Sequence, residues 1–270
     1  MKTAKHLTEY VISLEEKGEY CFTTNQALKA LGVSKKAFQM SLGRLRKKKQ
    51  LVTLSKKFHL IISPEYRSIG CLPPDHFISA YMQFLNLPYY VCLLSAAVYY
   101  GAAHQKPQVF QVMTNRQINS VICGKVTINF NFKKNISAMP IETFAVPTGY
   151  VKIATPEVTA MDLLKYNKSS GGINHVATVL TELIEKIDPE KMLQLAIDSG
   201  EVTWVQKLGY ILESLELDAN DKDKLLEQLK KFINECKPRY ALLVNNGIDG
   251  MAIKNKTWRI IANHKIESDL

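Results

Sequence analysis

Residues 34–49 of this 270-residue chain read SKKAFQMSLGRLRKKK, and they decide how the N-terminal part should fold. Ser34 is a favourable helix N-cap, because its hydroxyl accepts a hydrogen bond from the backbone of the first turn. Phe38, Leu42 and Leu45 follow at helical spacing and form one apolar stripe. The stretch therefore predicts an amphipathic helix with one buried face and a cationic outer face.

The segments on either side of this helix complete a typical order of elements. Upstream, residues 23–33 (TTNQALKALGV) predict a short helix that ends at Gly32, because glycine favours the left-handed conformation at a helix end. Downstream, residues 51–62 (LVTLSKKFHLII) predict two strands joined by Ser55-Lys56-Lys57. A short helix, a glycine turn, a basic helix and a basic hairpin are typical of a winged helix-turn-helix, which places one helix in the major groove of DNA.

The charge of the chain is concentrated in this region. Residues 34–58 hold nine Lys or Arg and no Asp or Glu, and residues 1–66 hold thirteen basic against five acidic residues. The other 204 residues are nearly balanced, with 22 basic and 20 acidic, although the net charge is +10. A basic module attached to a near-neutral body favours double-stranded DNA as the partner.

The outer face of the basic helix and the hairpin tip supply the candidate DNA-binding residues. We expect phosphate contacts from the cationic side chains, which are Lys35, Lys36, Arg44, Arg46, Lys47, Lys56 and Lys57. Base contacts would fall to Gln39 and Arg44, with Ser41 as a further candidate if it lies nearer the groove. A simpler alternative is a solvated helix end, where cations are favourable against the helix dipole. The coincidence of the charges with the helix-turn-helix spacing favours DNA.

The remaining pattern predicts an α+β protein with a second domain. We expect a winged helix-turn-helix at 1–66, a connector at 67–87, and a C-terminal domain at 88–270. Within that domain the sequence predicts a mixed α/β part at 88–168, a mainly helical part at 172–236 and short strands over 239–263. The apolar run 89–101 is expected to be a helix. Gly209, inside a predicted helix, is expected to permit a close helix crossing.

The sequence contains none of the common catalytic motifs. Its five cysteines include no C-x-x-C pair, its six histidines include no H-E-x-x-H, and no Walker A, G-x-G-x-x-G or G-x-S-x-G occurs. A nuclease-like set would require Glu142, Lys152, Glu157 and Asp162, but Glu157 fits better as an acid in the first turn of a helix. We therefore expect no enzyme activity, no cofactor and no metal.

The N-terminal segment and the apolar runs bear on location. Residues 1–6 are charged rather than apolar, and the longest apolar run, 89–103, is too short to span a bilayer. We expect a cytoplasmic protein without a membrane partner.

Four segments resemble the AbiEi antitoxin family, the transcriptional-regulator half of AbiE-type bacterial abortive-infection (type IV toxin–antitoxin) systems. They are 89–101 (YYVCLLSAAVYYG), 155–164 (TPEVTAMDLL), 207–213 (KLGYILE) and 258–263 (WRIIAN). Together with the helix-turn-helix, the resemblance covers nearly the whole chain in the expected order. One departure is Val158, which stands where a basic or polar residue is expected after the Pro-Glu pair.

The resemblance implies a function with two parts. The winged helix would bind inverted repeats in the promoter of its own operon and repress it. The C-terminal domain would neutralise a cognate nucleotidyltransferase-like toxin. Three alternatives stay open: a transcription factor whose C-terminal domain senses a ligand or contacts a protein, a nuclease guided by the winged helix, and an inhibitor that contacts its toxin directly, with DNA binding secondary.

Overall fold

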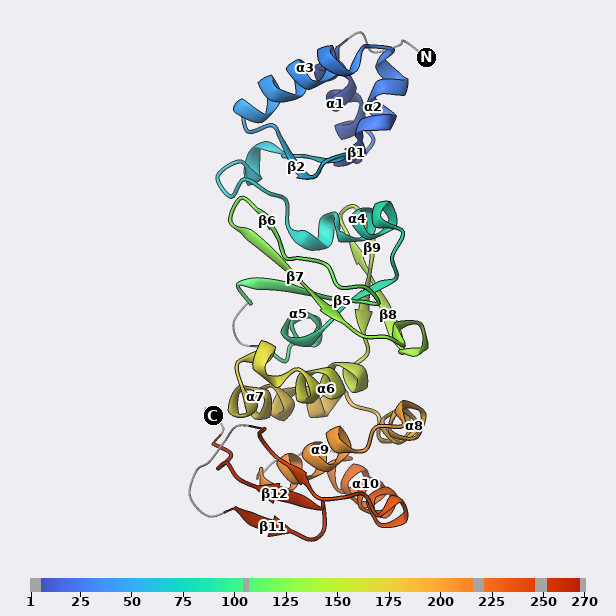
Figure 1. Cartoon of the computed structure of the whole chain (residues 1–270), viewed down its shortest axis with the longest axis vertical. Coiled ribbons are helices and arrows are strands. Elements are labelled where there is room, and N and C mark those ends of the chain that lie inside the picture. The colour runs from blue at the N-terminus through green and yellow to red at the C-terminus, as the bar shows by residue number, and fades with distance from the viewer. Residues whose placement is uncertain (1–5, 104–106, 216–220, 246–251, 268–270) are drawn as a thin grey trace. The chain divides into compact units, whose positions relative to one another are not determined.

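The computed structural model describes residues 6–103, 107–215, 221–245 and 252–267. Helices and strands are mixed along these residues, and the strands form two three-stranded sheets and one six-stranded sheet (Figure 1). The protein is thus a mixed α and β structure, as the sequence predicts. None of the helices in this described part is both long and apolar enough to cross a membrane.

The chain divides into two compact units, and neither is one continuous stretch. The first unit comprises Met1–Val91, Gln108–Ala138 and Glu142–Ile153, and the second comprises Cys92–Pro107, Met139–Ile141 and Ala154–Leu270. The domain boundaries that the sequence suggests near residues 66 and 87 stay predictions.

The N-terminal module of the first unit (residues 6–63) contains three helices and a small sheet. In chain order these are α1 (Leu7–Glu15), β1 (Cys21–Thr23), α2 (Thr24–Leu31), α3 (Lys35–Lys47), β2 (Leu51–Ser55) and β3 (Phe58–Ile61). The sheet is antiparallel in the order β1-β3-β2. Both expected helices and both expected strands are present. Strand β1 was not predicted, because three residues are too few to show an alternating pattern.

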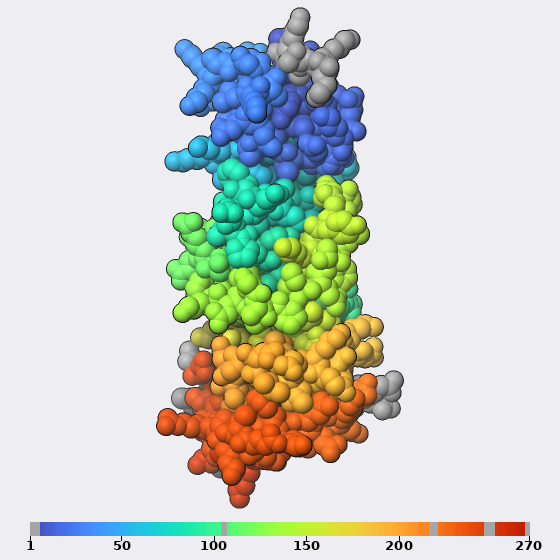
Figure 2. All heavy atoms as spheres, turned by 90° about the vertical axis from the view of Figure 1, so that its right-hand side faces the viewer, coloured from blue at the N-terminus to red at the C-terminus, as the bar shows by residue number. Residues whose placement is uncertain are grey.

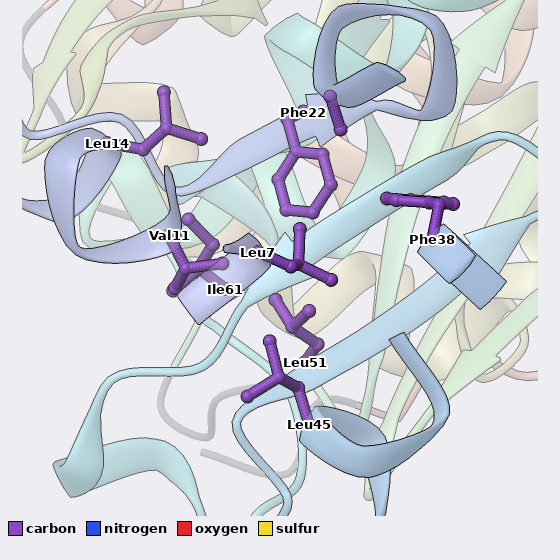
Figure 3. Close-up of a cluster of buried hydrophobic side chains, with 9 residues drawn as sticks. Leu7, Val11, Leu14, Phe22, Phe38, Leu45, Leu51 and Ile61 are labelled. Atoms are coloured by element: carbon purple, nitrogen blue, oxygen red, sulfur yellow. The ribbon is translucent and has the colours of Figure 1, made fainter. Parts of the chain in front are cut away.

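One hydrophobic core holds the module together (Figure 3). It takes residues from all three helices and all three strands, and its buried members are Leu7, Val11, Leu14, Phe22, Ala27, Phe38, Leu45, Leu51 and Ile61. The stripe predicted on α3 faces this core, with Phe38 and Leu45 buried and Leu42 partly buried against it. Burial of one stripe fixes which face of α3 points to solvent.

The rest of the first unit is built on the six-stranded sheet, preceded by η1 (Pro64–Tyr66), η2 (Pro74–His76) and α4 (Ile78–Leu85). The strands are β4 (Tyr89–Val91), β5 (Val109–Thr114), β6 (Val121–Cys123), β7 (Val126–Phe132), β8 (Ile141–Val146) and β9 (Gly149–Ala154). Their order is β6-β7-β5-β4-β9-β8, with β5 parallel to β7 and antiparallel to β4. A short helix, η4 (Ile136–Ala138), lies between β7 and β8 in the chain.

Two sequence predictions were wrong in this region. The expected helix over 89–101 begins instead with strand β4, and only α5 (Leu93–Ala97) and η3 (Val98–Tyr100) are helical. Tyr89–Val91 is buried, and a short apolar run buried on every side has no periodicity that separates strand from helix. The alternation of apolar and polar residues over 126–132 predicts a strand with one buried face. On β7, however, Ile128 is fully buried but Phe132 is 44% exposed, so that face is only partly buried.

The second unit is mainly helical, with α6 (Pro156–Lys165), α7 (Ile173–Leu183), α8 (Pro189–Ser199), α9 (Thr203–Ser214) and α10 (Lys222–Cys236). Short 3-10 turns, η5 (Asn167–Ser170) and η6 (Ile184–Lys186), follow α6 and α7. The last strands, β10 (Ala241–Leu242), β11 (Ile253–Asn255) and β12 (Ile260–Ala262), form the sheet β10-β12-β11.

Gly209 on α9 permits a close approach, but not the helix crossing that the sequence predicts. Its partner is the indole of Trp258 rather than another helix: a Cβ built on Gly209 would lie 2.1 Å from Cζ3 of that ring. Trp258 is fully buried and its Nε1 donates a hydrogen bond to Glu213 at 2.6 Å. Residue 209 is therefore a packing position.

Candidate nucleic-acid interface

Helix α3 presents a cationic face to solvent opposite its buried stripe. The Ser34 hydroxyl accepts a hydrogen bond from the Ala37 N–H at 3.2 Å, so the predicted cap begins the helix. A 100° step places Lys36, Met40 and Lys47 on the face away from Phe38 and Leu45. Lys36 and Lys47 are exposed, and Met40 is 56% exposed although it is apolar. In Figure 2, several side chains in the lighter blues of residues 35–60 extend into solvent.

The structure exposes eight of the nine candidate residues; these are Lys35, Lys36, Gln39, Arg44, Arg46, Lys47, Lys56 and Lys57. Ser41 is half-buried. Lys56 and Lys57 form the turn between β2 and β3, and the Lys57 carbonyl accepts a hydrogen bond from the Thr24 N–H at 2.9 Å. The hairpin tip is thus attached to the first residue of α2.

The cationic side chains of this face have no acidic partners among the described residues. Across the described part of the chain, none of Lys35, Lys36, Arg44, Arg46, Lys47, Lys56 or Lys57 forms an ion pair. A cation that is already paired would have to give up its carboxylate before binding a phosphate. An unpaired, solvated lysine loses only water and a mobile counterion, whose release favours binding to DNA.

His59 supports this face from beneath. It is 1% exposed on β3, and its ring contacts those of Phe22 and Phe38, at centroid distances of 5.2 and 5.8 Å. Its two ring nitrogens lie within hydrogen-bond distance of the Thr24 and Thr53 hydroxyls, at 2.9 and 3.0 Å. Burial, with a smaller contribution from the nearby Arg46 charge, lowers the pKa of His59 to about 4. At neutral pH it is therefore an uncharged link between α2, β2 and β3.

A cleft of about 460 Å³ lies where the first turn of α1 meets the C-terminal half of α3. Its lining residues are His6, Leu7, Thr8, Ser41, Arg44, Leu45, Lys47 and Lys48. The N-terminal end of a helix carries unpaired N–H groups and a partial positive charge, which add to the charges of Arg44 and the two lysines. Ser41 lies in this cleft, which favours a phosphate rather than a base edge as its contact.

A second, larger cleft adjoins the other side of α3, and we call it the Arg67 cleft. Its volume is about 750 Å³, and it is lined by Gly43, Arg46, Lys47, Lys49, Leu51, Val52, Ile62, Arg67, Ser68, Ile69, Gly70, Gly124 and Lys125. Only Arg46 and Lys47 among its cations were candidates from the sequence. Lys49 belongs to the same basic run and was within reach of sequence reasoning.

Arg67 and Lys125 carried no signal in the sequence, because 57 residues separate them. They are brought to one cleft by the β6–β7 turn, whose Lys125 N–H donates to the Ile69 carbonyl at 2.9 Å. Gly124 has a φ of +57°, and a Cβ there would lie 2.2 Å from the Ile69 oxygen. Gly70, at φ +77°, is also close, since a Cβ on Gly70 would lie 3.3 Å from the Gly124 Cα. Two glycines without side chains therefore allow this contact.

Two carboxylates of the nuclease alternative are buried in the packing of the second unit. The Glu157 carboxylate is 4% exposed and accepts a hydrogen bond from the Asp188 N–H at 3.0 Å, so it holds the chain at the start of α8. Asp162, on the same helix, is fully buried. In the described ranges no three His, Cys, Asp or Glu side chains gather in a way that would hold a metal ion.

Comparisons with known proteins bear on both the family and the fold. Residues 89–214 match the family model described as the AbiEi antitoxin C-terminal domain. The resemblance seen in the sequence is thereby confirmed for this part of the chain. The crystal structure of the RV2827C protein from Mycobacterium tuberculosis is similar in fold, with a TM-score of 0.66 over 93% of this chain and 89% of that one, at 13% identity. No curated protein matches the chain by sequence.

Proposed function

We propose that this chain, which carries an AbiEi antitoxin C-terminal domain at residues 89–214, is the antitoxin of a type IV toxin–antitoxin system and represses its own promoter. In this proposal residues 1–66 act as a winged helix-turn-helix. The observation that carries it is the face of α3, whose cations are exposed and unpaired within the described residues. The role is that of a non-enzymatic cytoplasmic regulator.

The order and pairing of elements support the DNA-binding part. Helices α2 and α3 are separated only by residues 32–34, and an antiparallel hairpin with two exposed lysines at its tip follows α3. This order of elements is typical of winged helix-turn-helix modules, in which the second helix enters the major groove and the hairpin contacts phosphates. Inverted repeats in the promoter would be bound by the two protomers of a dimer, or by two monomers that bind one after the other, about one helical turn apart.

The test of repression is a gel-shift titration on the DNA upstream of the gene, compared with scrambled DNA, at two salt concentrations. We expect a specific shift whose affinity falls with salt at a log–log slope near −5, as for about six neutralised phosphates. The double variant Lys36→Ala/Arg44→Ala should lose most of this affinity. Lys17→Ala, an exposed lysine after α1, is the matched control. Equal binding to both DNAs, or wild-type affinity in the double variant, would refute operator recognition by α3.

The antitoxin part predicts a partner that is encoded nearby. We expect a co-transcribed gene for a nucleotidyltransferase-like toxin, whose expression stops growth unless this chain is present, as in defence against phage by abortive infection. Co-purification of the two proteins would show direct contact, whereas rescue of growth without co-purification would indicate that neutralisation does not require direct contact. Failure to rescue growth would favour the alternative, a winged-helix transcription factor whose C-terminal domain senses a ligand or contacts another protein.

A further inference from the structure

The Arg67 cleft has more positive charge than the fold requires. Five cations line it: Arg46, Lys47, Lys49, Arg67 and Lys125. No Asp or Glu is among its described lining residues, and within the described chain none of the five forms an ion pair. Like charges gathered in one concave site repel one another, and a bound anion removes that repulsion.

Arg67 has an incomplete set of hydrogen bonds. Its Nε is buried and has no partner among the residues that the structure describes. A buried N–H group without an acceptor is unfavourable, and native structures rarely contain one unless a water, ion or ligand completes it. The guanidinium is planar and well matched to two oxygens of one phosphate group.

The backbone of the cleft is held in unusual conformations. Lys49, just after α3, has a φ of +57°, a left-handed conformation that glycine or asparagine adopts more readily than lysine. Gly70 and Gly124 also have positive φ and are in direct backbone contact. These features place Lys49 and Lys125 beside the same cleft.

We propose that the Arg67 cleft binds a phosphate group, with Arg67 as the residue that fixes its orientation. At about 750 Å³ the cleft is within the size range of small-molecule sites, so it has room for a phosphate-bearing molecule such as a nucleotide. The phosphate group has two possible sources. The first is a free ligand, and the second, because Arg46 and Lys47 belong also to the candidate DNA face, is a backbone phosphate of DNA beside the half-site. Only the second source rests on the proposed function.

The first arm of the test uses the full-length protein, without DNA, and titrates it calorimetrically with ATP, pyrophosphate and adenosine. If the source is a free ligand, we expect ATP and pyrophosphate to bind and adenosine not to bind. Arg67→Met should then weaken binding by about tenfold or more, since a charge-assisted bidentate contact is lost. Lys152→Met, which removes an exposed lysine on β9 outside the cleft, should bind as the wild type does.

The second arm measures the salt dependence of binding to the upstream DNA. If the source is the DNA backbone, Arg67→Met should reduce the log–log slope by about one, the amount expected for one lost phosphate contact, and Lys152→Met should not. The thermal midpoint of Arg67→Met should equal or exceed that of the wild type, since the change removes an unpaired buried N–H. This separates lost binding from lost folding.

The outcomes distinguish the two proposals. Arg67→Met behaving like Lys152→Met in both arms would overturn the phosphate site. If Lys36→Ala/Arg44→Ala leaves DNA binding intact while Arg67→Met loses ATP, the proposed repressor function fails and the cleft stands. If Arg67→Met reduces the salt slope of DNA binding but does not change ATP binding, the site is assigned to the DNA backbone.

Discussion

Helices α3 and α10 are both amphipathic and rich in lysine, but their charges have different surroundings. On α10, Lys224 pairs with Glu190 at 2.5 Å and Lys230 with Glu213 at 2.6 Å. On α3, no cation forms an ion pair with a described residue. The number of lysines is therefore a poor guide to a binding surface. The absence of carboxylates around them is the informative property, and it distinguishes the helix that we propose to meet DNA.

The α10 region also joins its charges to an aromatic core. Lys230 Nζ lies 5.8 Å from the centre of the Trp258 ring, and the same indole donates to Glu213. Burial acts to raise the pKa of Glu213, but hydrogen bonds from Lys230 and Trp258 outweigh it and lower the pKa overall. The carboxylate is thus held ionised as part of the packing, whereas the α3 cations have no such partner among the described residues.

The largest expected effect comes from disturbing this packing at Gly209. We expect Gly209→Ala to reduce the free energy of unfolding by about 3 kcal/mol or more, because its Cβ would overlap the Trp258 ring and the buried helix has little freedom to shift. Chemical denaturation measures this loss. The control is Gly43→Ala on α3, where no atom lies within 4 Å of the added Cβ. That change should instead raise the free energy of unfolding by about 0.5 to 1 kcal/mol.

The second effect acts on the support of α3 and depends on pH. His59 has a folded pKa of about 4, below its unfolded value of 6.5, so the unfolded state binds more protons between these values. The stabilisation that uncharged His59 gives the folded state is complete above pH 6.5 and is lost as the pH falls toward 4. We expect a loss of about 2 to 3 kcal/mol over this window, at about 1.4 kcal/mol per pKa unit.

Unfolding in urea at about pH 7 and at about pH 4.5, near the two ends of this window, measures the His59 contribution. The variant His59→Gln removes this titration, so its stability should depend less on pH than that of the wild type, although it is less stable at neutral pH. Identical pH profiles for the two proteins would contradict the assignment.

A smaller effect is expected from replacing the lysine that follows each helix, and it differs between α3 and α10. Lys49 after α3 and Lys237 after α10 both adopt left-handed backbone, with φ of +57° and +45°. Replacing either with glycine should raise stability by up to about 1 kcal/mol, because glycine adopts this conformation without a Cβ clash. Only Lys49→Gly should also weaken phosphate binding, since Lys237 lines neither cleft. Thermal melts measure the stability of both variants, and the calorimetric titration with ATP shows which of them binds phosphate more weakly.

The smallest expected effect is the loss of an ion pair on α10. Lys230→Ala should cost at most about 1 kcal/mol, because Lys230 and Glu213 are each more than a third exposed and the pair is screened by solvent. It should leave DNA binding unchanged in the gel shift. A marked loss of DNA binding would remove the distinction between the two helices.

The sequence predicted what local patterns determine. The apolar stripe of α3, the Ser34 cap and the hairpin with Lys56 and Lys57 each follow from spacing and residue type. Strand β4 did not, since its three residues are buried throughout and lack a periodic signal. The Arg67 cleft did not either, because its site depends on a backbone contact between Gly70 and Gly124, which lie far apart in the chain.

The interleaved course of the chain has a genetic consequence. Because the two units exchange segments at residues 91, 107, 138, 141 and 153, a premature stop codon before Ile141 removes β8 and β9 from the sheet of the first unit as well as nearly all of the second. A stop codon shortly after Ala154 leaves every strand of that sheet encoded. Nonsense alleles in this gene should therefore fall into two classes, divided near codon 154, and only the later class is expected to retain any function of the first unit.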